Sequence, residues 1–139
     1  MHAIKILSKD IDIETIALFQ PTSPLRKAHH IKQAFNKFTK HNFDSLISVS
    51  GIDSKYLKLF FELKKGYLTS INIDFPFMPR QELPKTFLPN GAIYLSSCRS
   101  FIKHKGFYSN NLGFYEMTKE DSLDIDTMTD LKAISKLKL

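Results

Sequence analysis

The chain has 139 residues, of which 42% are hydrophobic and 24% are charged, with 12 Phe, no Trp and one Cys. This length and apolar content predict one globular domain with a real core, and the varied, aromatic-rich composition argues against disorder. No apolar run approaches the roughly 18 residues of a membrane-spanning helix, and the first ten residues lack the pattern of a signal peptide. The single cysteine, Cys98, cannot form an internal disulfide, which fits a reducing compartment. We therefore expect a soluble, cytoplasmic protein without a membrane partner.

The net charge of +6 and the pI near 9.4 raise the question of a nucleic-acid or phosphate-bearing partner. The lysines and arginines are spread along the chain, however, and their tightest cluster, residues 26–32, is typical of a solvated helix face. No basic stripe is interleaved with aromatic residues. We expect no nucleic-acid partner.

The first half of the chain has the pattern of a βαβ unit. Residues 14–19 form a short, near-continuous apolar run, which favours a strand buried in a parallel sheet. Two prolines make residues 21–24 a loop, and apolar residues then recur at helical spacing over 25–40. Residues 44–50 predict a second strand, closed by Gly51. Strand, helix and strand imply a right-handed crossover and an α/β class.

The middle of the chain predicts a β-hairpin. Residues 57–63 and 67–73 are two β-leaning runs separated by a glycine-containing turn at 64–66. Residues 74–80 are interrupted by proline and are expected to be irregular. A hairpin that projects from an α/β body could bury its apolar face on a partner subunit.

The βα pattern then resumes. Residues 90–96 predict a strand entered through an Asn-Gly turn, Ser97 is placed to cap a short helix, and residues 113–117 predict one more strand. Residues 127–139 have helical spacing, and Thr127 with Asp130 makes a start that resembles a capping box.

The sharpest chemical feature is the acidic segment 120–127. In an extended segment Asp124 and Asp126 lie two residues apart, so both carboxylates project to one side and can hold Mg²⁺. The structural alternative is that Asp126 or Thr127 caps the last helix while the other carboxylates are solvated.

Two further groups of residues could bind a ligand. The loop 20–26 follows a strand, where ligands bind in open α/β sheets; Gln20 could contact polar groups, and Ser23 and Arg26 could meet a phosphate or carboxylate. The alternative is a rigid proline turn with polar caps. Arg80, Asn90 and Tyr94 supply a guanidinium, an amide and a phenol, which suit an anionic polyhydroxylated ligand, although each is more often an ion-pair or strand residue.

Other chemistries have weaker support. The histidines form no spaced pair with a nearby acid, so no zinc site is expected. Cys98 has one basic neighbour, Arg99, and we expect a packing role for its thiol. The chain contains neither a nucleophile elbow nor a glycine-rich phosphate loop.

Three stretches taken together resemble one family, the acylneuraminate cytidylyltransferases (CMP-sialic acid synthetases). They are residues 19–26, residues 80–84 running on to 88–94, and residues 121–127, and their order and spacing cover nearly the whole chain. The resemblance implies a Rossmann-like, three-layer α/β nucleotidyltransferase fold. It also implies transfer of CMP from CTP to the anomeric hydroxyl of N-acetylneuraminate or a related nonulosonic acid, with release of pyrophosphate.

The same resemblance implies roles for individual residues. Asp124 and Asp126 would be the catalytic ligands of Mg²⁺. Residues 55–80 would form a hairpin arm for homodimerisation. The remaining implied positions contact substrate, with Lys58 and Arg80 reaching the neighbouring subunit's site and the aromatic pair lining the sugar pocket: Gln20, Ser23, Arg26, Lys58, Arg80, Asn90, Tyr94, Phe107 and Tyr108.

The chain departs from the family pattern at its front. Family members begin with a strand and a glycine- and lysine-bearing loop that holds the CTP phosphates, and residues 1–12 contain no such loop. We therefore expect residues 1–139 to form a single, N-terminally incomplete cytidylyltransferase domain that is weak or inactive as an isolated chain. The alternative is a non-catalytic dimerising remnant, or a sugar-acid-binding subunit that needs a separate N-terminal piece.

Overall fold

The computed structural model describes residues 2–7 and 9–135. The chain divides into two compact units: Met1–Ser50 with Pro89–Leu139, here called the sheet unit, and Gly51–Leu88, here called the hairpin unit. The elements in chain order are α1 (His2–Leu7), β1 (Thr15–Leu18), α2 (Ala28–Lys40), β2 (Ser45–Ile52), η1 (Ser54–Lys58), β3 (Phe60–Lys64), β4 (Tyr67–Ser70), η2 (Arg80–Glu82), β5 (Thr86–Ser97), α3 (Cys98–His104), β6 (Leu112–Met117) and α4 (Met128–Ile134).

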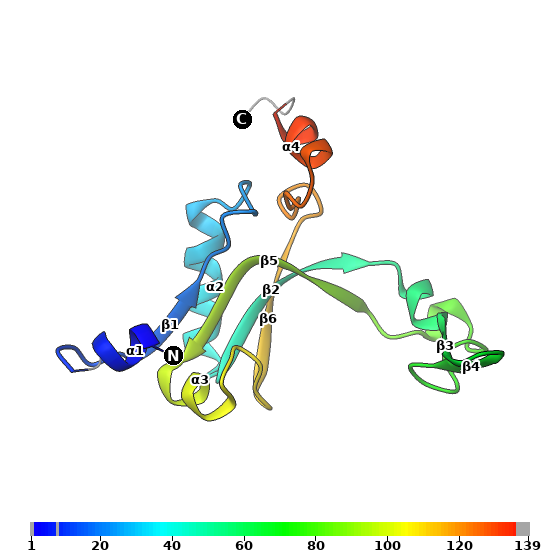
Figure 1. The fold of residues 1–139 in the computed structure, drawn as a ribbon, viewed down its shortest axis with the longest axis horizontal. Helices are drawn as coiled ribbons and strands as arrows, with labels where there is room; N and C mark the ends of the chain where they lie inside the picture. Colours follow the sequence, from blue (N-terminus) through cyan, green and yellow to red (C-terminus); the bar gives the residue numbers. More distant parts are fainter. Residues whose placement is uncertain (1, 8, 136–139) are drawn as a thin grey trace. The chain divides into compact units, whose positions relative to one another are not determined.

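The sheet unit is built on a four-stranded mixed sheet in the order β1-β5-β2-β6 (Figure 1). β1 runs antiparallel to β5, with Thr15 opposite Ser97, and β2 runs parallel to β6. The hydroxyls of Ser45 and Ser96 lie 3.2 Å apart, and the N–H of Ile93 donates to Ser48 Oγ, so β2 and β5 run in opposite directions. The α/β class is confirmed, but the sheet is mixed where the first strand predicted a parallel one.

The placement of β1 is the main departure from the predicted βαβ unit. β5 lies between β1 and β2, and β1 is at the edge of the sheet, with 43% of Leu18 exposed. An apolar run of four residues does not distinguish an edge strand from a central one, because that difference is set by pairing with residues 94–97, far along the chain.

One face of the sheet is covered by α2. Ala34 and Phe38 lie one helical turn apart and pack with buried residues of the strands: Leu46, Ala92, Ile93, Leu95 and Met117. The helix begins at Ala28, because the N–H of Lys27 donates to His30 Nδ1 in a capping box. Leu25, which fits the helical spacing, is buried in the preceding loop instead.

β5 continues through the Asn-Gly pair that predicted a turn before it. Gly91 has φ +75°, a conformation that glycine adopts without strain. Asn90 is held in the strand by the hydrogen bonds described below, so the pair marks an irregularity inside the strand.

The two helix caps predicted from the sequence are confirmed. Ser97 Oγ accepts from the N–H of Ser100 at the start of α3. At α4, the N–H of Asp130 donates to Thr127 Oγ1, and the N–H of Thr127 donates to Asp130 Oδ2. Residues 136–139 of the predicted last helix lie outside the described residues. No helix in the described ranges is long and apolar enough to cross a membrane.

The hairpin unit contains the predicted β-hairpin. β3 and β4 pair antiparallel around a turn in which Gly66 has φ +80°, and a bulge lies between Glu62 and Lys64. Both strands are shorter than predicted: the first run begins in η1, and the second strand ends at Ser70. The large apolar side chains of the hairpin unit are mostly exposed. The most exposed are Leu63 (74%), Ile73 (81%) and Phe77 (83%).

Candidate functional site

Three segments far apart in the sequence meet at the end of β1: the loop 20–26, residues 90–92 of β5 and the acidic segment 118–127. Ser23, which is 2% exposed, donates from Oγ to the carbonyl of Asn90 (3.3 Å). The N–H of Ile125 donates to the carbonyl of Thr22 (2.9 Å). The structure therefore brings together the first motif stretch, the end of the second around Asn90 and the third, whereas residues 80–84 of the second stretch belong to the hairpin unit.

Asn90 connects these segments through its side chain. Its Oδ1 accepts from Ser48 Oγ (2.6 Å) and from the N–H of Ala92 (3.2 Å), while Nδ2 donates to Ser122 Oγ (2.8 Å). Ser122 in turn donates to the carbonyl of Thr118. With 8% of its surface exposed, Asn90 positions the segments around it.

Ser48 and Ser122, the hydrogen-bond partners of Asn90, were not among the site residues predicted from the sequence. Ser48 is 1% exposed and lies in a strand whose other buried residues are largely apolar. A serine at a buried strand position needs a hydrogen-bond partner, and that pattern is the signal that could have found it.

Arg26 holds the loop 20–26 against β5. Its Nη1 donates to the carbonyls of Gln20 and Ala92, each over 2.9 Å, and its guanidinium lies over the Phe19 ring at 5.1 Å from the centroid. These contacts fit the rigid-turn interpretation of the loop and leave the predicted anion contact of Arg26 a prediction.

The side chain of Gln20 lies against the backbone of Gly91. A Cβ atom added at position 91 would overlap Gln20 Oε1 and would also approach Ser23 Oγ. Glycine therefore makes room for the Gln20 amide at this point of β5.

A charged cluster closes the side of the site next to α2. Lys27 Nζ lies 2.9 Å from Asp121 Oδ1, and His30 Nε2 lies 3.5 Å from Asp121 Oδ2. The hydrogen bond from Lys27 is the main cause that lowers the pKa of Asp121. Burial lowers the pKa of His30, and burial raises the pKa of Tyr115, whose hydroxyl donates to Gln33 Oε1. Asp121 thus acts in an ion pair, where the sequence favoured a solvated side chain.

Asp124 and Asp126 lie next to this cluster in the chain. Asp124 is half-buried, and its Oδ1 accepts from the N–H of Ile125 (3.1 Å). Asp126 is exposed, and its N–H donates to Asp130 Oδ2. The cap of α4 is formed by Thr127 and Asp130, so the carboxylate of Asp126 does not serve as that cap.

The donor chemistry of this pair fits a magnesium ion. Carboxylate oxygens are the ligands that Mg²⁺ prefers, and Mg²⁺ usually keeps several waters or substrate oxygens beside one or two carboxylates. Among the described residues, no group of three or more His, Cys, Asp or Glu side chains is placed to hold a metal.

The aromatic residues expected at the sugar pocket are partly brought together. The rings of Tyr94 and Phe107 lie 5.5 Å apart, and Phe107 also packs edge-to-face on Phe101. Tyr108 is 75% exposed. Tyr94 and Phe107 thus form one aromatic cluster.

Two predicted residues belong to the hairpin unit. Lys58 ends η1 and is half-buried. Arg80 Nη2 lies 2.7 Å from Asp53 Oδ2. The hydrogen bond from the N–H of Lys55 is the main cause that lowers the pKa of Asp53, and Arg80 lowers it further. Arg80 therefore forms a surface ion pair, which is the alternative to ligand binding that the sequence analysis gave for this residue.

The mixed sheet, with polar loops gathered at one end beside a pair of carboxylates, defines an α/β protein with one candidate site at the end of β1. Comparison with curated proteins shows which known proteins the chain is similar to. The chain is 38% identical over 126 residues to an N-acylneuraminate cytidylyltransferase of Streptococcus agalactiae serotype III, with 89% of the chain and 30% of the relative covered. It is 31% identical over 134 residues to an N-acylneuraminate cytidylyltransferase of Escherichia coli O18:K1:H7, with 94% and 30% covered. No protein-family model matches the sequence.

The chain is homologous to the N-acylneuraminate cytidylyltransferases, an enzyme family, and the resemblance drawn from its motifs is confirmed. A CMP-N,N'-diacetyllegionaminic acid synthase of Legionella pneumophila is also 31% identical, over 96% of the chain and 57% of the relative. The chain spans about 30% of the length of the curated cytidylyltransferases that it matches.

Proposed function

We propose that this chain forms the part of a cytidylyltransferase that binds the sugar acid and the metal ion. The reaction transfers CMP from CTP to the anomeric hydroxyl of N-acetylneuraminate or a related nonulosonic acid and releases pyrophosphate. The observation that carries the proposal is the meeting of the loop 20–26 and the acidic segment around Asn90 of β5. Asp124 and Asp126 belong to that acidic segment. The names of the relatives supply the substrates.

In this proposal Asp124 and Asp126 hold Mg²⁺, which when bound neutralises negative charge on the nucleotide phosphates. The chain's own residues bind and orient the sugar. Gln20 offers its amide beside Gly91, and the ring of Tyr94, supported by Phe107, supplies an apolar wall. Asn90, Ser23 and Arg26 fix the backbone that carries these side chains. Holding the reactants in place accounts for a large part of the rate of such a transfer.

The finer features of the fold belong to the same proposal. The sheet unit is taken as part of a Rossmann-like, three-layer nucleotidyltransferase domain. Residues 55–80 are taken as an arm through which two chains dimerise, with Lys58 and Arg80 reaching the partner's site. The exposed apolar side chains of β3, β4 and the segment after them support this arm, since large exposed apolar surfaces are typical of interfaces.

A second candidate function is a dimerising subunit that binds the sugar acid without catalysis. It is supported by the exposed apolar side chains of the hairpin unit together with the polar side chains gathered around Asn90, which need no catalysis to dimerise or to bind a sugar acid. Both candidates share the sugar side of the site and differ in whether this chain by itself can hold CTP.

The test measures pyrophosphate release by the purified chain with CTP, N-acetylneuraminate and Mg²⁺, and binding of the sugar acid by saturation-transfer NMR. We expect sugar-acid binding together with turnover far below that of a full-length relative, and loss of this turnover in Asp124→Asn. Asp12→Asn, an exposed aspartate distant in sequence from the motifs, is the matched control and should leave the rate unchanged.

The outcomes separate the candidates. Sugar-acid binding without turnover in this assay, which contains Mg²⁺, favours the binding subunit. A folded chain that neither binds the sugar acid nor releases pyrophosphate contradicts both. Turnover that persists in Asp124→Asn contradicts the role given to the carboxylate pair.

A further inference from the structure

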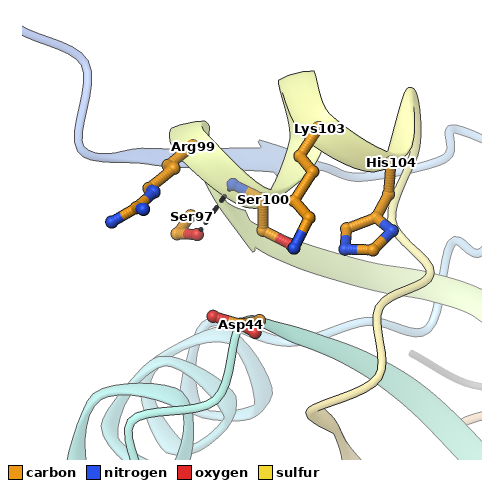
Figure 2. Close-up of a pocket in the computed structure, with 6 residues that line it drawn as sticks. All are labelled: Asp44, Ser97, Arg99, Ser100, Lys103 and His104. Atoms are coloured by element: carbon orange, nitrogen blue, oxygen red, sulfur yellow. Dashed lines mark hydrogen bonds between the residues drawn. The ribbon is translucent and has the colours of Figure 1, made fainter.

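A cavity lies in the sheet unit between α3 and the residue that precedes β2. It has a volume of about 380 Å³ and is lined by Asp44, Ser97, Arg99, Ser100, Lys103 and His104 (Figure 2). This volume is within the range of about 300–1,000 Å³ that is typical of small-molecule sites. Figure 2 shows Lys103 and His104 pointing from α3 toward the side on which Asp44 lies.

The cavity is at the other end of the sheet from the candidate substrate site. Thr15, the first residue of β1, pairs with Ser97 at the cavity, and the loop 20–26 follows the last residue of β1. Along β5, Ser97 is seven residues from Asn90, which corresponds to roughly 20 Å of extended chain. The reaction proposed above does not use the residues of this cavity.

The cavity wall contributed by α3 is rich in donors that have no protein partner. Arg99 and Lys103 form no ion pair with any carboxylate of the described residues. Ser100 is 5% exposed, and its buried Oγ makes no hydrogen bond to the described protein atoms. A buried hydroxyl without a partner is unfavourable, so the hydroxyl gains from any acceptor that enters the cavity.

We propose that this cavity binds a small phosphorylated sugar or polyol. A guanidinium and an ammonium group next to a hydroxyl donor form a set suited to a tetrahedral phosphate, because the charged donors make strong hydrogen bonds to its oxygens. Arg99 and Lys103 bind the phosphate by charge, and Ser100 Oγ donates to one of its oxygens.

Asp44 gives the cavity its preference for a hydroxylated ligand. Its carboxylate has no ion-pair partner among the described residues, whereas its backbone carbonyl accepts from the N–H of Ser97 (3.0 Å). A carboxylate repels a bare phosphate but accepts hydrogen bonds from sugar hydroxyls. The site therefore favours glucose 6-phosphate over inorganic phosphate.

The experiment titrates the full chain with glucose 6-phosphate, inorganic phosphate and glucose, using amide chemical shifts to locate binding and calorimetry to measure affinity. We expect glucose 6-phosphate to bind saturably with shifts at residues 97–104, inorganic phosphate to bind more weakly, and glucose not to bind. The double variant R99Q/K103Q should weaken glucose 6-phosphate binding at least about tenfold. Lys32→Gln, which removes one exposed charge from α2, is the control and should bind normally.

Two more variants separate a built site from general attraction by a basic surface. Ser100→Ala should weaken binding without lowering the unfolding midpoint, because the hydroxyl it removes has no protein partner. Asp44→Asn should strengthen binding of inorganic phosphate and narrow its difference from glucose 6-phosphate.

The proposal is overturned if no saturable shifts occur at residues 97–104. It is equally overturned if Lys32→Gln weakens binding as much as R99Q/K103Q, since that would indicate non-specific attraction. Shifts centred on residues 20–26 would assign the phosphate to the candidate substrate site and would also contradict it.

Discussion

The N–H of Ile125 donates a 2.9 Å hydrogen bond to the carbonyl of Thr22, across a hundred residues of sequence. This bond joins the acidic segment to the loop that follows β1. A second connection runs from Asn90 Nδ2 to Ser122 Oγ, so each motif segment is bonded to another. The positions of Asp124 and Asp126 therefore depend on residues that do not themselves bind a metal.

Replacing Asn90 tests this dependence. Asn90→Ala removes the 2.6 Å acceptor of Ser48 Oγ and the side-chain acceptor of the Ala92 N–H, both in a buried setting. We expect a loss of about 3 kcal/mol in the free energy of unfolding, measured by urea denaturation. Asn110→Ala, at an exposed position, should change that free energy by less than about 0.5 kcal/mol. Equal effects of the two substitutions would show that Asn90 does not organise the site.

The conformation of Gly91 leads to a second prediction. Gly91→Ala places a Cβ at φ +75°, where it overlaps Gln20 Oε1, so the backbone is strained and the amide must move. We expect a destabilisation of about 1–2 kcal/mol and altered NMR signals of the Gln20 side-chain amide. Gly106→Ala is the control, because a Cβ there meets no atom within 4 Å. An unchanged Gln20 amide signal in Gly91→Ala would contradict the predicted contact.

The buried histidine predicts a pH dependence of stability. Burial is the largest cause that lowers the pKa of His30 from its ordinary value of 6.5, with His29 adding to the effect and Asp121 opposing it. As the pH falls below about 6.5 the unfolded chain binds a proton that the folded chain does not, so stability is lost until the pH reaches the lower pKa of the folded state. The thermal midpoint should therefore fall between pH 7 and pH 5.

His30→Asn removes this titration, since an asparagine oxygen can accept from the N–H of Lys27 without binding a proton. Its thermal midpoint should vary less with pH over the same interval. His41→Asn, at an exposed position after α2, should retain the dependence of the original chain. If His30→Asn and the original chain lose stability equally, His30 is not the responsible group.

The proposed dimer makes a prediction about the hairpin unit. Ile73 and Phe77 expose 81% and 83% of their surface, and replacing both by Asp should convert a dimer to a monomer in analytical ultracentrifugation. The unfolding midpoint of the monomer should change little, because neither side chain is buried within the chain. Ile11→Asp, which changes an exposed residue of the sheet unit, should leave the dimer intact. If the unsubstituted chain is already monomeric, the proposed role of residues 55–80 as a dimerisation arm is contradicted.

Features set by neighbouring residues could be predicted from the sequence. The cap of α3 by Ser97, the pair of Thr127 and Asp130, and the glycine of the hairpin turn each depend on contacts within a few residues. The edge position of β1 and the path of β5 through Asn90 and Gly91 could not be predicted in the same way. Both depend on β5 pairing between β1 and β2, which no local pattern encodes.

The candidate site shows the same division. The structure brings together the loop 20–26, the part of β5 around Asn90 and the acidic segment, which are three of the segments that carry the motifs. Ser23, Arg26 and Asn90 were expected to contact a ligand, yet all three form hydrogen bonds within the protein. Their main partners are backbone carbonyls and serine hydroxyls. Such partners are distant in sequence and common in composition, so no motif distinguishes them.

The hydrogen bonds of Asn90 also show that a residue of a sequence motif can have a structural role. Several residues of the motifs form hydrogen bonds between segments that are distant in the sequence. Such hydrogen bonds are needed wherever these segments must keep their relative positions. A sequence motif made of such residues therefore indicates a shared fold. Catalytic activity depends instead on the few side chains that these hydrogen bonds hold in position.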